Sequence, residues 1–297
     1  MCGVVVALGN FDGVHLGHRV VVRRAVEEGR RRGLRVVAAT FDPHPQAVLR
    51  PGSEPKLLTP LEVRKELLLA CGVDEVHPIR FDEKLSKKRP EEFVWEVLVG
   101  RLEAMVVVVG ENFRFGYRAS GGVEDLRRCM REAGGEVYAV PVYAFLGESI
   151  SSTKIRALIA GGEVREAARL LGRSYSLRGE VVAGDGRGRA IGFPTANVLP
   201  DACALVPGRG VYVGHVRVGS ERYGACTNVG VAPTFDRQDS RVEAHLLDYE
   251  GDLYGRVVDV TFVERLRPEK RFSGIGELKE QIARDVDEAR RITNHTL

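Results

Sequence analysis

Short apolar runs rich in β-branched residues alternate with helical patterns through the first 172 residues, and this alternation constrains the fold more than any other feature. Near-continuous apolar runs of this length are typical of strands that are buried on both faces. Strands that alternate with helices indicate a parallel sheet covered by helices on both sides. The expected strands are Val4–Leu8, Val36–Thr40, Met105–Val109 and Glu136–Val140.

The alternation stops after Gly172, where strands begin to follow one another closely with glycine-rich turns between them. This spacing favours a small closed antiparallel barrel or a sandwich. A final helix is expected at roughly Ile275–Ile292. We therefore expect two domains, residues 1–172 and 173–297. The expected strands of the second domain are Ser176–Ala183, Val211–Val218, Arg222–Val229, Arg241–Tyr249 and Arg256–Glu264.

Composition excludes several classes of protein. The 297-residue chain is 44% hydrophobic and 29% charged, and none of its apolar runs approaches the ~18 residues of a membrane span. Its formal net charge of +3 is too small to argue for nucleic-acid binding by itself. The five cysteines are scattered without metal or redox spacing, which favours reduced structural thiols. We expect a cytoplasmic protein that acts on small molecules, with neither a nucleic-acid nor a membrane partner.

The most informative motif follows the first expected strand. A glycine-rich turn at residues 9–13 leads to His15 and His18, directly before a helix expected from about Arg19. Unpaired backbone N–H groups and the positive end of a helix dipole make such a turn receptive to phosphate. Imidazoles at this point can donate hydrogen bonds to charge that builds on a phosphate. This stretch therefore indicates nucleotide chemistry.

A second phosphate-directed site is expected where Ser151, Ser152 and Thr153 precede a helix that carries Lys154 and Arg156. Hydroxyls at a helix N-terminus and nearby cations suit an anionic ligand. The alternative is an ordinary capped helix with solvated basic residues. Ligands of parallel α/β sheets bind beyond the carboxyl ends of the strands, where these loops and the loop at residues 110–116 are expected.

The second half offers three further candidates. The glycine-rich loop at 184–189 can wrap phosphates, although an ordinary basic turn is the alternative. Thr195 and Asn197 are two residues apart on an extended chain and offer hard oxygen ligands to Mg²⁺; a self-capping turn is the alternative. Glu243, pointing into the mouth of the barrel, is a candidate general base. Its alternative is a carboxylate paired with an arginine such as Arg241.

In combination these motifs resemble the prokaryotic FAD synthetase family, which joins a riboflavin kinase to an FMN adenylyltransferase. The resemblance runs from about residue 3 to residue 290. The matching segments are Gly-Asn-Phe-Asp-Gly-Val-His-Leu-Gly-His (9–18), Asp-Pro-His-Pro (42–45), Gly-Glu-Asn-Phe-Arg-Phe-Gly (110–116), Ile-Ser-Ser-Thr-Lys-Ile-Arg (150–156), Gly-Asp-Gly-Arg-Gly-Arg-Ala-Ile-Gly-Phe-Pro-Thr-Ala-Asn (184–197), Gly-Val-Tyr (210–212), Thr-Asn-Val-Gly-Val-Ala-Pro-Thr-Phe (227–235) and Glu-Ala-His-Leu-Leu-Asp (243–248).

The resemblance implies a Rossmann-like nucleotidyltransferase domain followed by a six-stranded riboflavin kinase barrel with a C-terminal helix. It also implies two reactions that consume ATP: riboflavin becomes FMN, and FMN then becomes FAD with release of pyrophosphate. His15 and His18 would stabilise the transferring phosphates, Glu243 would be the kinase base, and Thr195 and Asn197 would bind Mg²⁺ with ATP. The implied nucleotide- and flavin-binding residues are Gly9, Asn10, Phe11, Asp12, Gly13, Asn112, Arg114, Ser151, Ser152, Thr153, Arg156, Gly184, Gly186, Gly188, Arg189, Thr195 and Asn197.

Three other functions fit part of the sequence. A kinase attached to an inactive adenylyltransferase-like domain is opposed by the presence of both histidines and Arg156. A nucleic-acid-binding barrel is opposed by an aromatic content of only 7% and by arginines interleaved with acidic residues. A flavin-binding sensor without turnover would leave bound flavin unchanged when Mg²⁺ and ATP are added. The sequence makes no prediction of oligomeric state.

Overall fold

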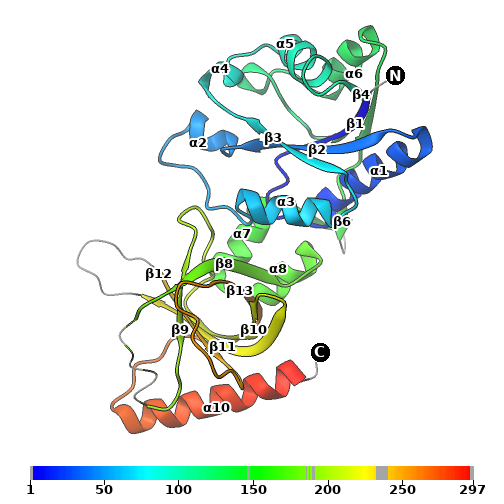
Figure 1. The fold of residues 1–297 in the computed structure, drawn as a ribbon. Coiled ribbons are helices and arrows are strands. Elements are labelled where there is room, and N and C mark those ends of the chain that lie inside the picture. The colour runs from blue at the N-terminus through cyan, green and yellow to red at the C-terminus, as the bar shows by residue number, and fades with distance from the viewer. Residues whose placement is uncertain are drawn as a thin grey trace. The chain divides into compact units, whose positions relative to one another are not determined.

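The computed structural model describes residues 3–145, 148–184, 186, 188, 191–231 and 240–294. The chain separates into two compact units, Met1–Ser152 and Thr153–Leu297 (Figure 1). This division falls at the start of helix α7 (Ser152–Gly161), so that α7 and α8 (Val164–Leu171) are grouped with the barrel. Helix α8 packs on two barrel strands, which explains the grouping. Our domain boundary after residue 172 lies beyond both helices and stays a prediction.

Within the described ranges, the first unit is built on a five-stranded parallel sheet with the order β3-β2-β1-β4-β5. Strands β1 and β5 lie where the sequence predicts them, and β2 and β4 extend one or two residues beyond the predicted ends. The chain reverses its winding direction between β1 and β4, which is where ligands of such sheets bind. The strands are β1 (Val4–Leu8), β2 (Arg35–Asp42), β3 (Glu75–Arg80), β4 (Ala104–Gly110) and β5 (Glu136–Val140).

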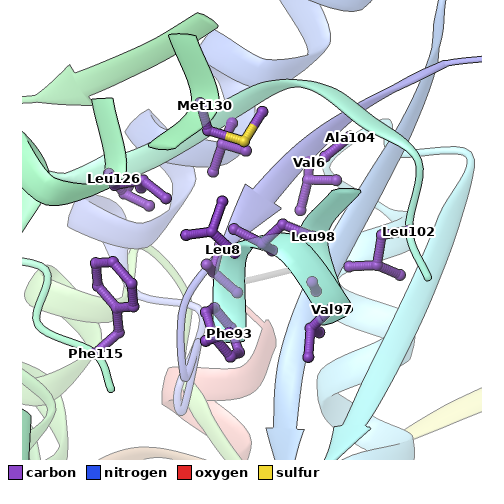
Figure 2. Packing of buried hydrophobic residues seen from close by; sticks show 14 of the residues in the cluster. Val6, Leu8, Phe93, Val97, Leu98, Leu102, Ala104, Phe115, Leu126 and Met130 are labelled. Atoms are coloured by element: carbon purple, nitrogen blue, oxygen red, sulfur yellow. The ribbon is translucent and has the colours of Figure 1, made fainter. Parts of the chain in front are cut away.

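Helices cover both faces of this sheet, as predicted. Alternate residues of β1 point to opposite faces: Val6 and Leu8 pack in one core cluster, Val5 and Ala7 in the other. Figure 2 shows the first cluster, where β1 side chains lie among residues of the covering helices. The helical segments are α1 (Leu16–Arg32), α2 (Pro45–Leu49), α3 (Leu61–Leu69), α4 (Glu83–Ser86), α5 (Pro90–Phe93), the π-helical turn η1 (Val94–Val99), the 3₁₀ turn η2 (Tyr117–Ala119) and α6 (Val123–Glu132).

Three local features differ from the sequence prediction or add to it. Strand β3 was not predicted, because Pro78 interrupts its pattern; the strand pairs only with β2 among the described strands, and an edge strand tolerates proline. Helix α1 begins at Leu16 rather than at about Arg19, because the His15 side chain caps it by accepting a hydrogen bond from the His18 N–H. A short hairpin follows β5, formed by β6 (Ala144–Phe145) and β7 (Glu148–Ser149).

The second unit contains a closed antiparallel barrel with the strand order β10-β11-β12-β9-β8-β13 in the part of the chain that the structure describes. The predicted barrel and C-terminal helix are confirmed, and the additional strand β9 completes the closure. Helix α10 (Ile275–Asn294) packs outside the barrel against β10 and β11. The barrel strands are β8 (Tyr175–Val182), β9 (Ala196–Pro200), β10 (Gly210–Val218), β11 (Glu221–Val231), β12 (Ser240–Leu246) and β13 (Val257–Arg267).

Strand β12 shows how α10 changes the barrel surface. Val242, Ala244 and Leu246 are buried, and they alternate with Glu243 and His245, which line a cleft together with residues of α10. Helix α10 therefore covers the outer face of the barrel wall at this strand. Our prediction that Glu243 points into the barrel mouth is wrong, since it lies on the outer face that α10 covers. Among the described residues, no helix is long and apolar enough to cross a lipid bilayer.

Candidate active sites

The first unit holds a cleft of about 660 Å³ at the carboxyl edge of its sheet. Its lining comes from the loops after β1, β2, β4 and β5 and from the N-terminus of α7, so the predicted convergence of polar loops is observed. Nine of the predicted site residues line this cleft: Gly9, Asn10, Phe11, His15, His18, Asn112, Arg114, Ser151 and Ser152.

His15 and His18 form one wall of this cleft. Their rings are stacked, with centroids 3.5 Å apart and planes 17° from parallel. Nδ1 of His15 accepts a hydrogen bond from the His18 backbone N–H at 3.2 Å, so the neutral ring carries its proton on Nε2. Both rings stand at the N-terminus of α1, where backbone N–H groups and the helix dipole favour negative charge. This wall is suited to bind polyphosphate.

The turn that carries these histidines is fixed from below by buried polar contacts. The Asp12 carboxylate accepts hydrogen bonds from the backbone N–H of Leu58 at 3.1 Å and of Thr59 at 2.9 Å. Gly13 donates its backbone N–H to Thr59 Oγ1 at 2.8 Å. Asp12 and Gly13, predicted to bind ligand, do not line the cleft. The contacts observed for both residues instead anchor the turn to the segment before α3.

Arg64 extends this scaffold, although nothing in the sequence pointed to it. Its side chain is 1% exposed and donates to Asn10 O, Thr40 Oγ1, Phe41 O and Thr59 O at 3.0–3.3 Å. One guanidinium thereby joins the turn after β1, the end of β2 and the segment before α3. Because a planar guanidinium carries five donors in a fixed geometry, few other side chains can satisfy so many acceptors.

The other side of the cleft is aromatic. The ring centroids of Phe113 and Phe115 are 5.7 Å apart and nearly parallel, and Phe93 lies 5.7 Å from Phe115. Phe41 joins the same row at 6.3 Å from Phe93. All four line the cleft. The stacked pair of Phe113 and Phe115 suits a flat aromatic ligand. Only the apolar spacing of the loop at 113–115 could have indicated this surface from the sequence.

The remaining predicted residues of this half lie around the start of α7. Ser152, the last residue of the first unit, donates its hydroxyl to the backbone carbonyl of Asp12 in the phosphate-directed turn at 2.9 Å. Asn112 is exposed, and Arg114 donates Nε to Ala119 O at 3.1 Å. Thr153 and Arg156 follow on α7 and belong to the second unit, so their part in ligand binding stays a prediction.

The second unit holds a cleft of about 340 Å³ between the outer barrel face and α10. Gly188, Thr195 and Glu243, all predicted site residues, line it. Asn197 and Asn228 stand directly opposite Glu243 on the two neighbouring strands. Asn228, which also lines the cleft, belongs to the matching segment 227–235, and only the pairing of β11 with β12 reveals that it stands beside Glu243. A row of amide, carboxylate and amide side chains therefore crosses three adjacent strands.

Arg241 connects two members of this row. It donates Nε and Nη2 to Asn197 Oδ1 at 3.0 and 2.8 Å, and its Nη2 lies 3.1 Å from Glu243 Oε1. The alternative that Glu243 pairs with Arg241 is thus confirmed. The two side chains are about a quarter exposed, at 24% for Arg241 and 26% for Glu243. The ion pair is reached by solvent and lies at the wall of the cleft.

The glycine-rich loop lies against the two candidate metal ligands. A Cβ on Gly184 would stand 2.7 Å from Asn197 Oδ1, and one on Gly188 would stand 3.2 Å from Thr195 Oγ1. Gly186 adopts a φ of 68°, which a residue with a side chain rarely takes. These glycines bring backbone close to Thr195 and Asn197, as a phosphate-binding loop requires. Arg189 lies outside the described residues.

Helix α10 forms the other wall of this cleft, and an ion pair attaches it to the barrel. The Asp285 carboxylate, 7% exposed at its side chain, pairs with Arg267 of β13 at 2.7 Å and also accepts from Gln281 Nε2 at 3.0 Å. Cys226 also lines the cleft, and burial raises the pKa of its thiol to about 12. A thiol with that pKa is not a nucleophile at neutral pH, which agrees with the predicted structural role.

Comparisons with known proteins agree with this arrangement. The FAD synthetase family model matches residues 1–154, and the riboflavin kinase family model matches residues 171–293. The bifunctional riboflavin kinase/FMN adenylyltransferase of Escherichia coli (strain K12) is 38% identical, covering 97% of this chain and 92% of that protein. The protein of the same description from Bacillus subtilis (strain 168) is 36% identical, covering 96% and 91%.

A solved structure from Streptococcus pneumoniae, described as a macrolide-efflux protein, is 34% identical with a TM-score of 0.89 and covers 97% of this chain and 94% of its own. That description names a different activity from the curated relatives, while the fold is shared over nearly the whole length. The two activities predicted from the motifs are those of both family models. The chain belongs to the family of bifunctional riboflavin kinase/FMN adenylyltransferases.

Proposed function

We propose that the cleft in the first unit carries out adenylyl transfer with His15 and His18 as hydrogen-bond donors to the ATP phosphates. An oxygen of the FMN phosphate attacks the α-phosphorus of ATP, and the bond to pyrophosphate breaks as the new P–O bond forms. The stacked histidine pair at the N-terminus of α1 is the observation that carries this proposal. Such displacements need positioning and charge stabilisation rather than a protein nucleophile.

The aromatic residues of the first cleft support a flavin-binding site there. Phe113 and Phe115 offer an apolar surface of two stacked rings, and Phe93 packs beside them. The isoalloxazine ring would lie on this surface, while Asn112, Ser151 and Ser152 would hold phosphate oxygens. Thr153 and Arg156 would add a hydroxyl and a cation from α7.

In the second unit, Glu243 would take the proton of the riboflavin 5′-hydroxyl as its oxygen attacks the γ-phosphorus of ATP. The bond between the γ-phosphorus and ADP breaks, and ADP leaves with the electron pair. The position of Glu243 in the row with Asn197, beside Thr195 and the glycine-rich loop, supports this role. A positioned base is typically worth roughly 10²–10⁴ in rate.

The donor set beside Glu243 also fits Mg²⁺. Thr195 and Asn197 offer hard, uncharged oxygen atoms, and the backbone of Gly184 and Gly188 lies against them. When bound, Mg²⁺ would neutralise charge on the ATP phosphates. Asn197 Oδ1 accepts from Arg241, so this guanidinium must release the oxygen before a cation can use it. Arg189 would add a cation to the phosphate-binding loop.

The remaining proposals concern the protein as a whole. We place the domain boundary at residues 172/173 and the protein in the cytoplasm, where thiols stay reduced. Cys129 and Cys226 carry free thiols, as this placement requires. The proposed ligands of the protein are riboflavin, FMN, ATP and Mg²⁺.

One experiment tests the two sites separately. The full chain is incubated with riboflavin, ATP and Mg²⁺, and the flavins are separated by chromatography. The wild-type protein should make FMN and then FAD. The double variant His15→Ala/His18→Ala should stop at FMN, and Glu243→Ala should leave riboflavin unchanged while still converting added FMN to FAD.

Two outcomes contradict the assignments. Undiminished FMN synthesis by Glu243→Ala would exclude Glu243 as the base. Undiminished FAD synthesis by the double histidine variant would exclude His15 and His18 as the donors to the ATP phosphates. A wild-type protein that stops at FMN would support the one-activity alternative.

A further inference from the structure

Arg241 occupies the atoms that the kinase reaction needs. Its guanidinium binds Oδ1 of Asn197, the oxygen proposed as a cation ligand, through two hydrogen bonds of 3.0 and 2.8 Å. The same Nη2 lies 3.1 Å from Oε1 of Glu243, the proposed base. One side chain therefore contacts both functional groups.

The strand geometry explains why one arginine reaches both groups. Arg241 and Glu243 are two residues apart on β12 and so point to the same side of the barrel wall. Glu243 stands opposite Asn197 of β9, so the guanidinium spans from its own strand to the neighbouring one. The register partner of Arg241 on β11 is Gly230, which has no side chain to compete for this space.

A divalent cation and this guanidinium exclude one another at Asn197. Both are positive, and both would use the same amide oxygen. A carboxylate oxygen that is held by a guanidinium is also less available to accept a proton from a hydroxyl group. Because Arg241 and Glu243 are only partly buried, the pair can separate without leaving an isolated charge in the core.

We propose that Arg241 is a positioning residue of the kinase reaction, which holds Asn197 and Glu243 until the metal–nucleotide complex displaces it. Release of the base then follows loading of the nucleotide. This inference depends on the proposed roles of Asn197 and Glu243. It adds an order of events to them: cation at Asn197 first, proton transfer to Glu243 afterwards.

The test compares Arg241→Met with Arg241→Lys, using Arg256→Met as the matched control. Arg256 is an exposed arginine at the edge of the same barrel and lies outside the cleft. Binding of Mn²⁺ with a non-hydrolysable ATP analogue is followed by electron paramagnetic resonance on the full chain. The signal that Asn197→Ala removes defines the site in the barrel and separates it from the first unit.

Arg241→Met should bind Mn²⁺ and the nucleotide analogue roughly tenfold more tightly at the barrel site, since hydrogen bonds to a charged group no longer oppose it. The Mg²⁺ concentration for half-maximal riboflavin kinase activity should fall by a similar factor. Arg241→Lys keeps the charge without the planar fork and should lie between Arg241→Met and wild type. Arg256→Met should match wild type.

Unchanged or weaker metal–nucleotide binding by folded Arg241→Met would overturn the proposal, weaker binding meaning that the arginine assists the phosphates. Circular dichroism verifies that each variant is folded. If Arg241→Met does not fold, Arg241→Lys provides the test. A different result points to the proposed metal site itself: if Asn197→Ala leaves all Mn²⁺ binding intact, the role of Asn197 fails.

Discussion

The two clefts that we propose to handle ATP phosphates are built from opposite kinds of structure. In the first unit the phosphate-directed groups are a helix N-terminus and two stacked histidines, carried by a turn that buried Asp12 and Arg64 fix from below. In the second unit the chemical groups are side chains of three strands, and a partly exposed arginine links two of them, Asn197 and Glu243. The first site is fixed by its scaffold, whereas the proposed cation site in the second unit is held by the Arg241 contacts with Asn197 and Glu243.

The largest expected effect comes from removing the scaffold of the first site. Arg64→Met removes four hydrogen bonds made by a buried guanidinium, so the first unit should lose about 3 kcal/mol or more of stability. FMN adenylylation should fall at least about 100-fold because the turn before α1 loses its support. Riboflavin phosphorylation should stay within about twofold of wild type. Hydrogen exchange of residues 9–18 and the two activity assays measure these effects.

Lys65→Ala is the control for that comparison. Lys65 is the next residue on α3, and its contact is a surface ion pair with Glu62, so the change should cost less than about 1 kcal/mol. If Arg64→Met leaves both adenylylation and hydrogen exchange as they are in Lys65→Ala, the buried scaffold does not hold the site.

The next largest effect tests whether the second cleft depends on α10. Asp285→Ala leaves the Arg267 guanidinium without its buried carboxylate and should destabilise the second unit by about 3 kcal/mol. Loosening of α10 should raise the KM for riboflavin, and FMN adenylylation should not change. Thermal unfolding and steady-state kinetics measure the two effects. A normal KM would mean that the opposite wall alone forms the flavin site.

A smaller effect tests the aromatic row of the first cleft. Phe113→Ala removes one ring of a stacked pair that lines the cleft, and Phe113 is only half-buried, so the fold should persist. The KM for FMN should rise about tenfold, because an aromatic contact and its buried area are lost. The riboflavin kinase KM should not move. Phe113→Tyr keeps the ring and should restore most of the affinity; an equal loss in both variants would argue against stacking.

Strand β1 is buried at every position, and it begins and ends where its apolar run does. The ends of β5 also match the prediction, although Val140 is the one buried residue of that strand. Edge strand β3 was missed because Pro78 and polar residues break its pattern, and an edge strand needs burial on fewer sides. Alternation along β12 places Glu243 and His245 on the same side of the strand, and both line the cleft. It could not tell which side faces the barrel interior, because α10 covers the outer face too.

The site residues divide into those that a local motif indicates and those whose role depends on contacts distant in sequence. Residues that carry chemistry stand in local motifs, and most of them line the two clefts as expected. Arg64 and Asn228 were missed because their roles arise from contacts between segments that are distant in sequence, which local patterns do not record. Asp12 was assigned to ligand binding because its motif contains it, whereas its carboxylate serves the backbone of residues 58–59.

The smallest expected effect concerns Glu136, a surface residue that lines neither cleft. Hydrogen bonds from Arg32 and Tyr138 lower the pKa of Glu136 to about 2. A lowered pKa in the folded state adds stability above the unfolded value of about 4.5, and this stability is lost as the pH falls towards 2. Because the Glu136 side chain is 53% exposed, solvent screening limits the gain to less than about 1 kcal/mol. Glu136→Gln should therefore be slightly less stable than wild type at pH 7 and equal to it near pH 2. Thermal unfolding at both pH values measures this difference, and a gap that stays constant with pH would show that the ion pair is not its source.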